Sequence, residues 1–159
     1  NQKKIIDFSM KEYKKRYNYV LYLHGKPGTG KSTVGYLLAK QMKGSLCDTW
    51  NPTEPSDSLD LIYNEVLPTE QNPLILVLEE FDKIIDLIHK QIPLHKNIPI
   101  YIRNKTSWNS LLDKIQLGIY PYLFLILNSN KSPEYINNID RSYIRKGRIN
   151  KIFKLESFC

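Results

Sequence analysis

Short apolar runs alternate along the chain with segments in which apolar residues recur at helical spacing. Residues 74–78 and 123–127 are uninterrupted apolar runs, which are typical of strands covered on both faces of a parallel sheet. We interpret three further runs, at residues 19–23, 45–47 and 151–155, as shorter strands. The pattern therefore predicts five strands.

Between these strands, apolar residues recur every three or four positions, as they do on one face of a helix. Four helices are predicted in this way. The apolar face of the first consists of Val34, Leu37, Leu38 and Met42, and Gly44 stops the pattern. That of the second consists of Leu59, Ile62 and Val66, and Pro68 ends it.

The apolar face of the third helix consists of Ile84, Ile85, Ile88 and Ile92, and Pro93 closes it. That of the fourth consists of Trp108, Leu111, Leu112 and Ile115, and either Thr106 or Ser107 is expected to cap its start. Residues 98–102 are interpreted as a short strand or an extended connection. The alternation of strands and helices predicts a three-layer α/β fold with a mainly parallel five-stranded sheet.

Length and composition narrow the possible architectures. With 159 residues, of which 42% are hydrophobic, we expect a single domain over residues 1–159, with residues 1–18 as an N-terminal lead-in. No apolar run approaches the roughly 20 residues of a membrane-spanning helix, so no transmembrane segment is expected. Cys47 and Cys159 lack the spacing of a metal site, which favours a reduced, intracellular protein. The three histidines are not spaced as a ligand set either, so no structural metal is expected.

The net charge of +7 is unevenly distributed. Residues 1–47 hold ten Lys and Arg against two acids, residues 48–82 hold nine acids and no base, and residues 83–159 hold thirteen bases against five acids. Basic flanks are compatible with a nucleic-acid partner. Several of these cations, however, belong to motifs that bind the phosphates of a small nucleotide, and a solvated basic surface is the other interpretation.

One glycine-rich segment matches the phosphate-loop (Walker A) pattern G-x-x-x-x-G-K-[ST] at every fixed position. It reads Gly25-Lys26-Pro27-Gly28-Thr29-Gly30-Lys31-Ser32. A predicted strand precedes it and a predicted helix follows, so backbone N–H groups of the loop and of the helix N-terminus converge on one anion. We expect Lys31 to reach the β- and γ-phosphates of ATP, Ser32 to ligate Mg²⁺, and Thr33 to add a hydroxyl near the α-phosphate. This motif predicts a P-loop NTPase fold.

Two acids follow the aliphatic run at residues 74–78, in the order Glu79-Glu80. This is the Walker B pattern, which places carboxylates at the carboxyl edge of the sheet, where α/β proteins bind ligands. We expect Glu79 to hold Mg²⁺ and Glu80 to orient and deprotonate the attacking water. Glu79 stands where this motif usually has Asp, one methylene shorter. Acidic side chains are also favoured in the first turn of a helix, and Asp82 suits this role in the helix that follows.

Residues 123–130 followed by residues 139–148 resemble the second region of homology of AAA ATPases. In that family a strand ends in a polar residue called sensor 1, usually the Asn of a Thr-Asn pair. The resemblance assigns this role to Asn130 in the pair Ser129-Asn130, with Asn128 as the alternative. The amide would position the lytic water or contact the γ-phosphate.

By the same resemblance, Arg145 and Arg148 are two arginine fingers that reach the γ-phosphate bound to a neighbouring subunit, since a planar guanidinium stabilises charge spread over phosphoryl oxygens. Asp140 is expected to cap the short helix that carries Arg145. The resemblance runs from Tyr19 to Leu155 and implies a ring, a hexamer in this family, formed by the large α/β subdomain without a C-terminal lid. Trp50 follows the second strand and either points into a central channel or anchors its loop.

The sequence thus favours Mg²⁺-dependent ATP hydrolysis by a ring-forming AAA-type ATPase that remodels or translocates a macromolecule. Three alternatives stay open. They are a replication or helicase-type ATPase acting on nucleic acid, a small-molecule or nucleoside kinase, and a non-catalytic subunit stabilised by nucleotide.

Overall fold

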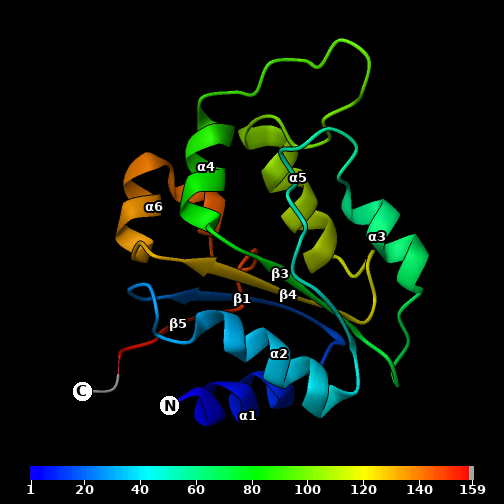
Figure 1. The fold of residues 1–159 in the computed structure, drawn as a ribbon, viewed down its shortest axis with the longest axis vertical. Helices are drawn as coiled ribbons and strands as arrows, with labels where there is room; N and C mark the ends of the chain where they lie inside the picture. The colour runs from blue at the N-terminus through cyan, green and yellow to red at the C-terminus, as the bar shows by residue number, and fades with distance from the viewer. Residues whose placement is uncertain (158–159) are drawn as a thin grey trace.

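Five parallel strands form a single sheet at the centre of the computed structural model, which describes residues 1–157. They are β1 (Asn18–His24), β2 (Ser45–Cys47), β3 (Leu74–Leu78), β4 (Leu123–Ser129) and β5 (Lys151–Lys154). Their order across the sheet is β2-β3-β4-β1-β5 (Figure 1). Every neighbouring pair is parallel, so the predicted three-layer fold is confirmed and the sheet is parallel throughout.

Helices cover both faces of this sheet (Figure 1). On one face lie α1 (Gln2–Tyr13) and α2 (Lys31–Met42). On the other lie α3 (Leu59–Val66), α4 (Phe81–His89), α5 (Lys105–Gln116), α6 (Pro133–Ile139) and the 3₁₀ turn η1 (Arg141–Ile144). No helix within residues 1–157 is long and apolar enough to cross a membrane.

The sheet separates two hydrophobic cores, because successive strand residues point to opposite faces. Along β3, Leu74, Leu76 and Leu78 pack on the side of α4 and α5, while Ile75 and Val77 pack on the side of α1 and α2. All five of these side chains are buried. This double burial explains why the strand is uniformly aliphatic.

Helix α1 occupies most of the segment that the sequence suggested only as a lead-in. Its buried positions, Ile5, Ile6, Ser9 and Tyr13, form one face against α2 and β1. At its start, the side-chain amide of Gln2 donates a hydrogen bond of 2.9 Å to the carbonyl of Gly30 in the phosphate loop. The segment is therefore part of the domain and reaches the candidate site.

One predicted helix end is confirmed and another is wrong. Helix α2 includes Met42 and ends before Gly44, as predicted, although Gly44 does not adopt the special conformation at its end. The residue after α2 in the left-handed conformation is Lys43 (φ 55°) and not Gly44. Gly44 is needed for space instead, because a Cβ there would lie 2.6 Å from the carbonyl oxygen of Pro73. Helix α4 ends at His89, so Ile92 lies outside it, and the backbone N–H of Ile92 bonds to the carbonyl of Arg103.

The cap of α5 is Asn104 and not Thr106 or Ser107. Asn104 accepts a hydrogen bond from the backbone N–H of Ser107, and the Ser107 hydroxyl accepts one in return, which forms a capping box. Residues 98–102 form no strand; they are an irregular connection with bends at Ile98 and Tyr101.

Trp50 is an anchor of its loop, because its side chain is buried in the core and its indole N–H donates to the carbonyl of Asp57. The alternative, that it points into a channel, is wrong. Of the two cysteines, Cys47 is a half-buried free thiol, and Cys159 lies outside the described residues.

Candidate active site

The phosphate loop connects the end of β1 at His24 to the start of α2 at Lys31, at the carboxyl edge of the sheet. Gly28 and Gly30 adopt left-handed backbone angles (φ 79° and 90°), which glycine reaches without strain. A Cβ at Gly30 would collide with the side chain of Gln2, and one at Gly25 with the carbonyl of Leu155. The loop is therefore fitted closely to its surroundings at both ends.

Lys31, the first residue of α2, is almost fully buried and folds back over the loop. Its ammonium donates to the carbonyl oxygens of Gly25 at 2.7 Å and Lys26 at 3.0 Å. Burial lowers the pKa of Lys31, and the carboxylates of Glu79 and Asp82 partly oppose this effect. The charge is thus held at the place where the sequence predicts the phosphates.

Glu79, directly after β3, meets the first turn of α2. The Ser32 hydroxyl donates to Glu79 Oε1 at 2.8 Å, and the side-chain amide of Asn128 donates to the same oxygen at 3.1 Å. Hydroxyl and carboxylate oxygens are the ligands that Mg²⁺ prefers. The structure therefore brings together the two side chains predicted to ligate the metal.

These groups border one cavity of about 250 Å³. It is lined by Pro27, Gly28, Gly30, Lys31, Ser32, Thr33, Glu79, Glu80, Asn128 and Asn130. Of the predicted phosphate-loop residues, Gly25, Lys26 and Thr29 do not line this cavity. Thr29 donates its hydroxyl to the Lys26 carbonyl, and both residues line a neighbouring cavity beside Leu155. The cavity combines backbone donors, an ammonium and two carboxylates, which fits a nucleotide phosphate chain with its metal.

Glu80 stands at the start of α4 with a left-handed backbone (φ 53°), a conformation that non-glycine residues rarely adopt. Its side chain is more than half exposed and pairs with Lys83 at 3.0 Å. Strained backbone of this kind is frequent at functional sites. The carboxylate lies at the cavity, and Lys83 bonds only one of its two oxygens, Oε1.

Asp82 does more than favour the first turn of α4. Its buried carboxylate accepts hydrogen bonds from the Ser129 hydroxyl at 3.1 Å and from the backbone N–H of Asn130 at 3.2 Å. It thereby ties the start of α4 to the end of β4. Sequence reasoning missed this contact, because the two segments are more than 45 residues apart.

The two candidate asparagines have different surroundings. Asn130 is exposed at the cavity, as its predicted role requires. Asn128 is 1% exposed, and its side-chain oxygen has no hydrogen-bond partner among residues 1–157. Both asparagines line the cavity, but of these two only Asn128 donates a hydrogen bond to Glu79.

The two predicted arginine fingers are held differently. The Arg145 side chain is 60% exposed, with its nearest carboxylate oxygen, on Asp113, 3.8 Å away. The Arg148 side chain is 9% exposed and donates to both oxygens of Asp113, at 2.8 and 3.1 Å, and to the Ser142 carbonyl at 2.7 Å. The prediction that Arg148 reaches another subunit does not fit these contacts, because all its guanidinium nitrogens are engaged within the chain.

The cap predicted for the Arg145 turn is confirmed. Asp140 accepts from the backbone N–H of Ser142 at 2.8 Å, at the start of η1. This bond, with help from Lys105 at 3.0 Å, lowers the pKa of Asp140 to about 2. The capped turn fixes the chain that carries Arg145 at the surface.

Residues 21–157 match the model of a family described as ATPase family associated with various cellular activities (AAA). The chain belongs to the AAA ATPase family. Among curated proteins, chromosome transmission fidelity protein 18 of Saccharomyces cerevisiae is 30% identical over 91 residues, which make up 54% of this chain and 12% of that protein. This AAA chain thus spans a small part of the length of that relative.

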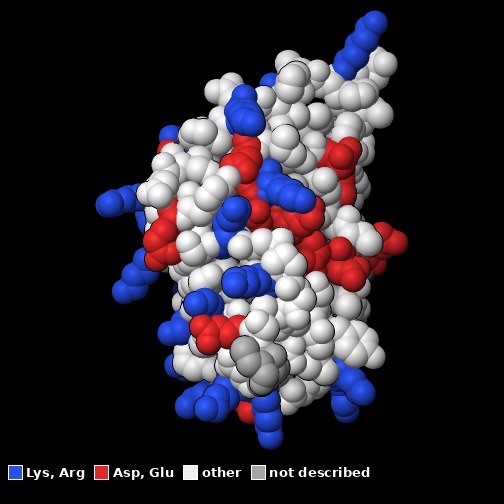
Figure 2. Space-filling view, turned by 60° about the vertical axis from the view of Figure 1, so that its left-hand side comes forward, with Lys and Arg blue, Asp and Glu red and all other residues white. Residues whose placement is uncertain are grey.

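Charges are unevenly distributed over the surface of this AAA domain. Figure 2 brings the carboxyl edge of the sheet forward and shows acidic side chains most numerous across the middle, where basic ones lie among them, and basic side chains predominant along the lower end. The lower end is where α1 and α2 lie in Figure 1. Apart from Lys26, the basic residues of positions 1–47 lie in α1 or α2 or within three residues after these helices.

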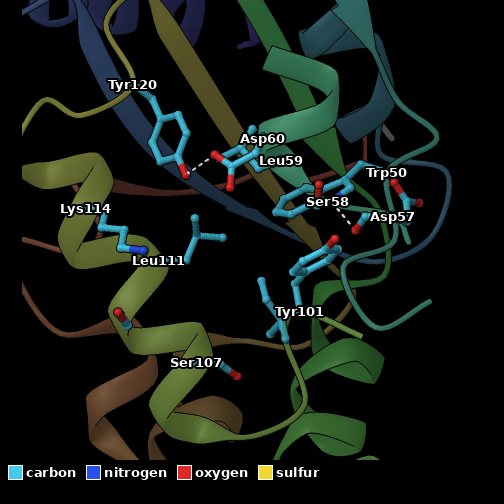
Figure 3. A pocket seen from close by; sticks show the side chains of 12 residues that line it. Trp50, Asp57, Ser58, Leu59, Asp60, Tyr101, Ser107, Leu111, Lys114 and Tyr120 are labelled. Atoms are coloured by element: carbon cyan, nitrogen blue, oxygen red, sulfur yellow. Dashed lines mark hydrogen bonds between the residues drawn. The ribbon is translucent and has the colours of Figure 1, made fainter. Parts of the chain in front are cut away.

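A second cavity of about 220 Å³ lies in this AAA domain between the loop before α3 and helix α5 (Figure 3). The Tyr120 hydroxyl donates to Asp60 at 2.7 Å, and Asp57 accepts from the backbone N–H of Asn51 at 2.8 Å. Both carboxylates thus hold local structure. None of the predicted site residues lines this cavity.

Proposed function

We propose that this chain binds ATP with Mg²⁺ in the cavity beside the phosphate loop and hydrolyses it. The observation that carries the proposal is the convergence of Ser32 and Glu79 at 2.8 Å, next to the buried ammonium of Lys31. Three segments distant in sequence supply the cavity: the phosphate loop, the end of β3 and the end of β4. AAA membership supports the same activity.

Each side chain has a distinct part in the proposed reaction. Lys31 exchanges its two loop carbonyls for phosphate oxygens, and the N–H groups at the start of α2 hold the same anion. Ser32 and Glu79 hold Mg²⁺, which when bound neutralises charge on the phosphoryl oxygens. Glu80 takes a proton from the attacking water, and Asn130 orients that water.

Arg145 completes the site of a neighbouring subunit in this proposal. It is exposed, does not line the cavity of its own chain, and is held on a capped turn. An arginine supplied by a partner accelerates phosphoryl transfer by about 10³–10⁵ in related chemistry. Arg148 supports it from inside by joining η1 to α5. Activity then requires a ring, which by resemblance is a hexamer.

The test is the ATPase rate per subunit measured against protein concentration. The parent should show a steep rise with concentration, and Arg145→Ala should remove most of the activity at every concentration. Glu80→Gln should keep ATP binding while losing turnover. A rate per subunit independent of concentration and unaffected by Arg145→Ala would contradict the ring. Phosphate transfer to an added nucleoside without hydrolysis would support the kinase alternative.

We propose further that hydrolysis drives work on a macromolecule, and the excess of basic residues in positions 1–47 favours nucleic acid as a second candidate function. Anisotropy of labelled single-stranded DNA at 50 and 200 mM salt tests this, because neutralising several phosphates makes affinity fall steeply with salt. Stimulation of the ATPase by DNA would support it. Absence of binding at low salt would leave a polypeptide as the candidate substrate.

A further inference from the structure

We infer that Asn128 is a positioning residue that holds Glu79 in the orientation required at the metal site. This inference rests on the proposed function, since it concerns how the same site is assembled. By the family resemblance, Asn128 is only the alternative residue for sensor 1. Its contacts give it a separate role, which acts through Glu79 and not on the attacking water.

The register of the sheet places the two side chains abreast. Leu78 of β3 pairs with Leu127 of β4, so Glu79 and Asn128 each follow a paired residue on adjacent parallel strands. Val77 and Ile126, two residues earlier, both pack on the α2 side of the sheet. Since strand residues two apart share a face, Glu79 and Asn128 also point towards α2, whose second residue is Ser32.

The hydrogen bond from Asn128 restrains Glu79, whose side chain is longer than the Asp usual at this position. Glu has one more rotatable bond than the Asp usual in the motif, and fixing a flexible side chain costs conformational entropy. Ser32 and Asn128 donate to the same oxygen, Oε1, from opposite elements. Two hydrogen bonds from different directions restrain the position of Oε1, and with it the side-chain torsions of Glu79, more than one hydrogen bond does.

The Asn128 amide is shielded from solvent. The residue is 1% exposed, and its side-chain oxygen is buried without a hydrogen-bond partner among residues 1–157. Leaving such an acceptor unpaired costs about 1–3 kcal/mol, so the side chain is kept in this place at a cost in stability. Because water scarcely reaches the amide, it does not compete with the hydrogen bond from the amide nitrogen to Glu79.

Metal affinity, measured by electron paramagnetic resonance of Mn²⁺ bound with ADP, tests this role. Partners that orient a metal ligand typically contribute 10- to 100-fold to metal affinity, so Asn128→Ala should weaken Mn²⁺ binding about 10-fold or more. ADP affinity measured in EDTA should stay within about twofold, because the phosphate loop is untouched. The matched control is Asn130→Ala, which removes an asparagine of the same cavity that does not touch Glu79.

A double-mutant cycle shows whether Asn128 acts through Glu79. Glu79→Asp shortens the carboxylate, so Asn128→Ala made in that background should change Mn²⁺ affinity by less than about twofold. Equal losses in both backgrounds would overturn the inference, as would an equal loss of ADP affinity in EDTA. If Asn128→Ala does not fold, Asn128→Thr keeps a donor on a β-branched side chain and should give an intermediate loss.

The outcomes separate the two proposals. A parent that binds neither ADP nor Mn²⁺ contradicts the proposed function. A parent that binds both, with Asn128→Ala indistinguishable from it, contradicts the role of Asn128 alone.

Discussion

Replacing Arg148 by Ala should destabilise the fold, although the family resemblance casts this residue as a finger. The change removes three hydrogen bonds, two to Asp113 and one to the Ser142 carbonyl. Removing one member of a fully buried ion pair costs about 3–5 kcal/mol, whereas an exposed pair contributes about 0–1 kcal/mol. Arg148 is 9% exposed but Asp113 is 42% exposed, so we expect a loss of about 2 kcal/mol between these limits.

Thermal and urea unfolding measure this loss. For a domain of this size, about 2 kcal/mol lowers the melting temperature by about 4–8 °C. Arg148→Lys keeps the charge but not the planar fork, so it should recover only part of the stability. Arg145→Ala is the matched control, because its exposed side chain should change stability by no more than about 0.5 kcal/mol. A destabilising Arg145→Ala with a neutral Arg148→Ala would refute the assignment of these two roles.

Lys31→Ala removes the ammonium held over the phosphate loop. Because a charged hydrogen bond is lost, ATP affinity measured by titration calorimetry should fall about 10- to 100-fold. An unchanged affinity would show that the phosphates bind elsewhere. Gly44→Ala puts a methyl 2.6 Å from the Pro73 carbonyl oxygen, so the unfolding free energy should fall by about 1–3 kcal/mol in urea, and a neutral effect would contradict that close approach. Asp140 has its pKa lowered from 3.8 to about 2, so its stabilisation is complete above the unfolded value and is lost as pH falls through about 2. Asp140→Asn should therefore make stability less dependent on pH between about 4 and 2, and an unchanged slope would show that the Ser142 cap does not carry this effect.

The sheet was the most predictable part of the fold, because burial on both faces leaves an unmistakable local pattern. The aliphatic run of β3 begins and ends where the sequence predicts. Helix α1 was missed because most of its surface is charged and only one narrow stripe, with Ser9 in it, is buried. Its packing against α2 decides its conformation, and that partner lies outside any local window.

In the candidate site, the sequence predicts those functional residues that lie next to one another along the chain and form a local motif. The phosphate loop from Gly25 to Ser32 and the pair Glu79-Glu80 are such local motifs. The separate roles of Arg145 and Arg148 could not be read in this way, because they depend on Asp113 in a different helix. The contact between Asn128 and Glu79 likewise becomes visible only when β3 and β4 are placed side by side.

The central claim, that Arg145 completes an ATP site on a neighbouring subunit, is tested most directly by mixing two inactive variants. Glu80→Gln loses the base but keeps Arg145, and Arg145→Ala loses the arginine but keeps the base. At a concentration where the parent is active, an equal mixture should regain a clear fraction of the parent ATPase rate, because some sites pair an intact Glu80 with an intact Arg145. A mixture no more active than the two variants alone would contradict the claim.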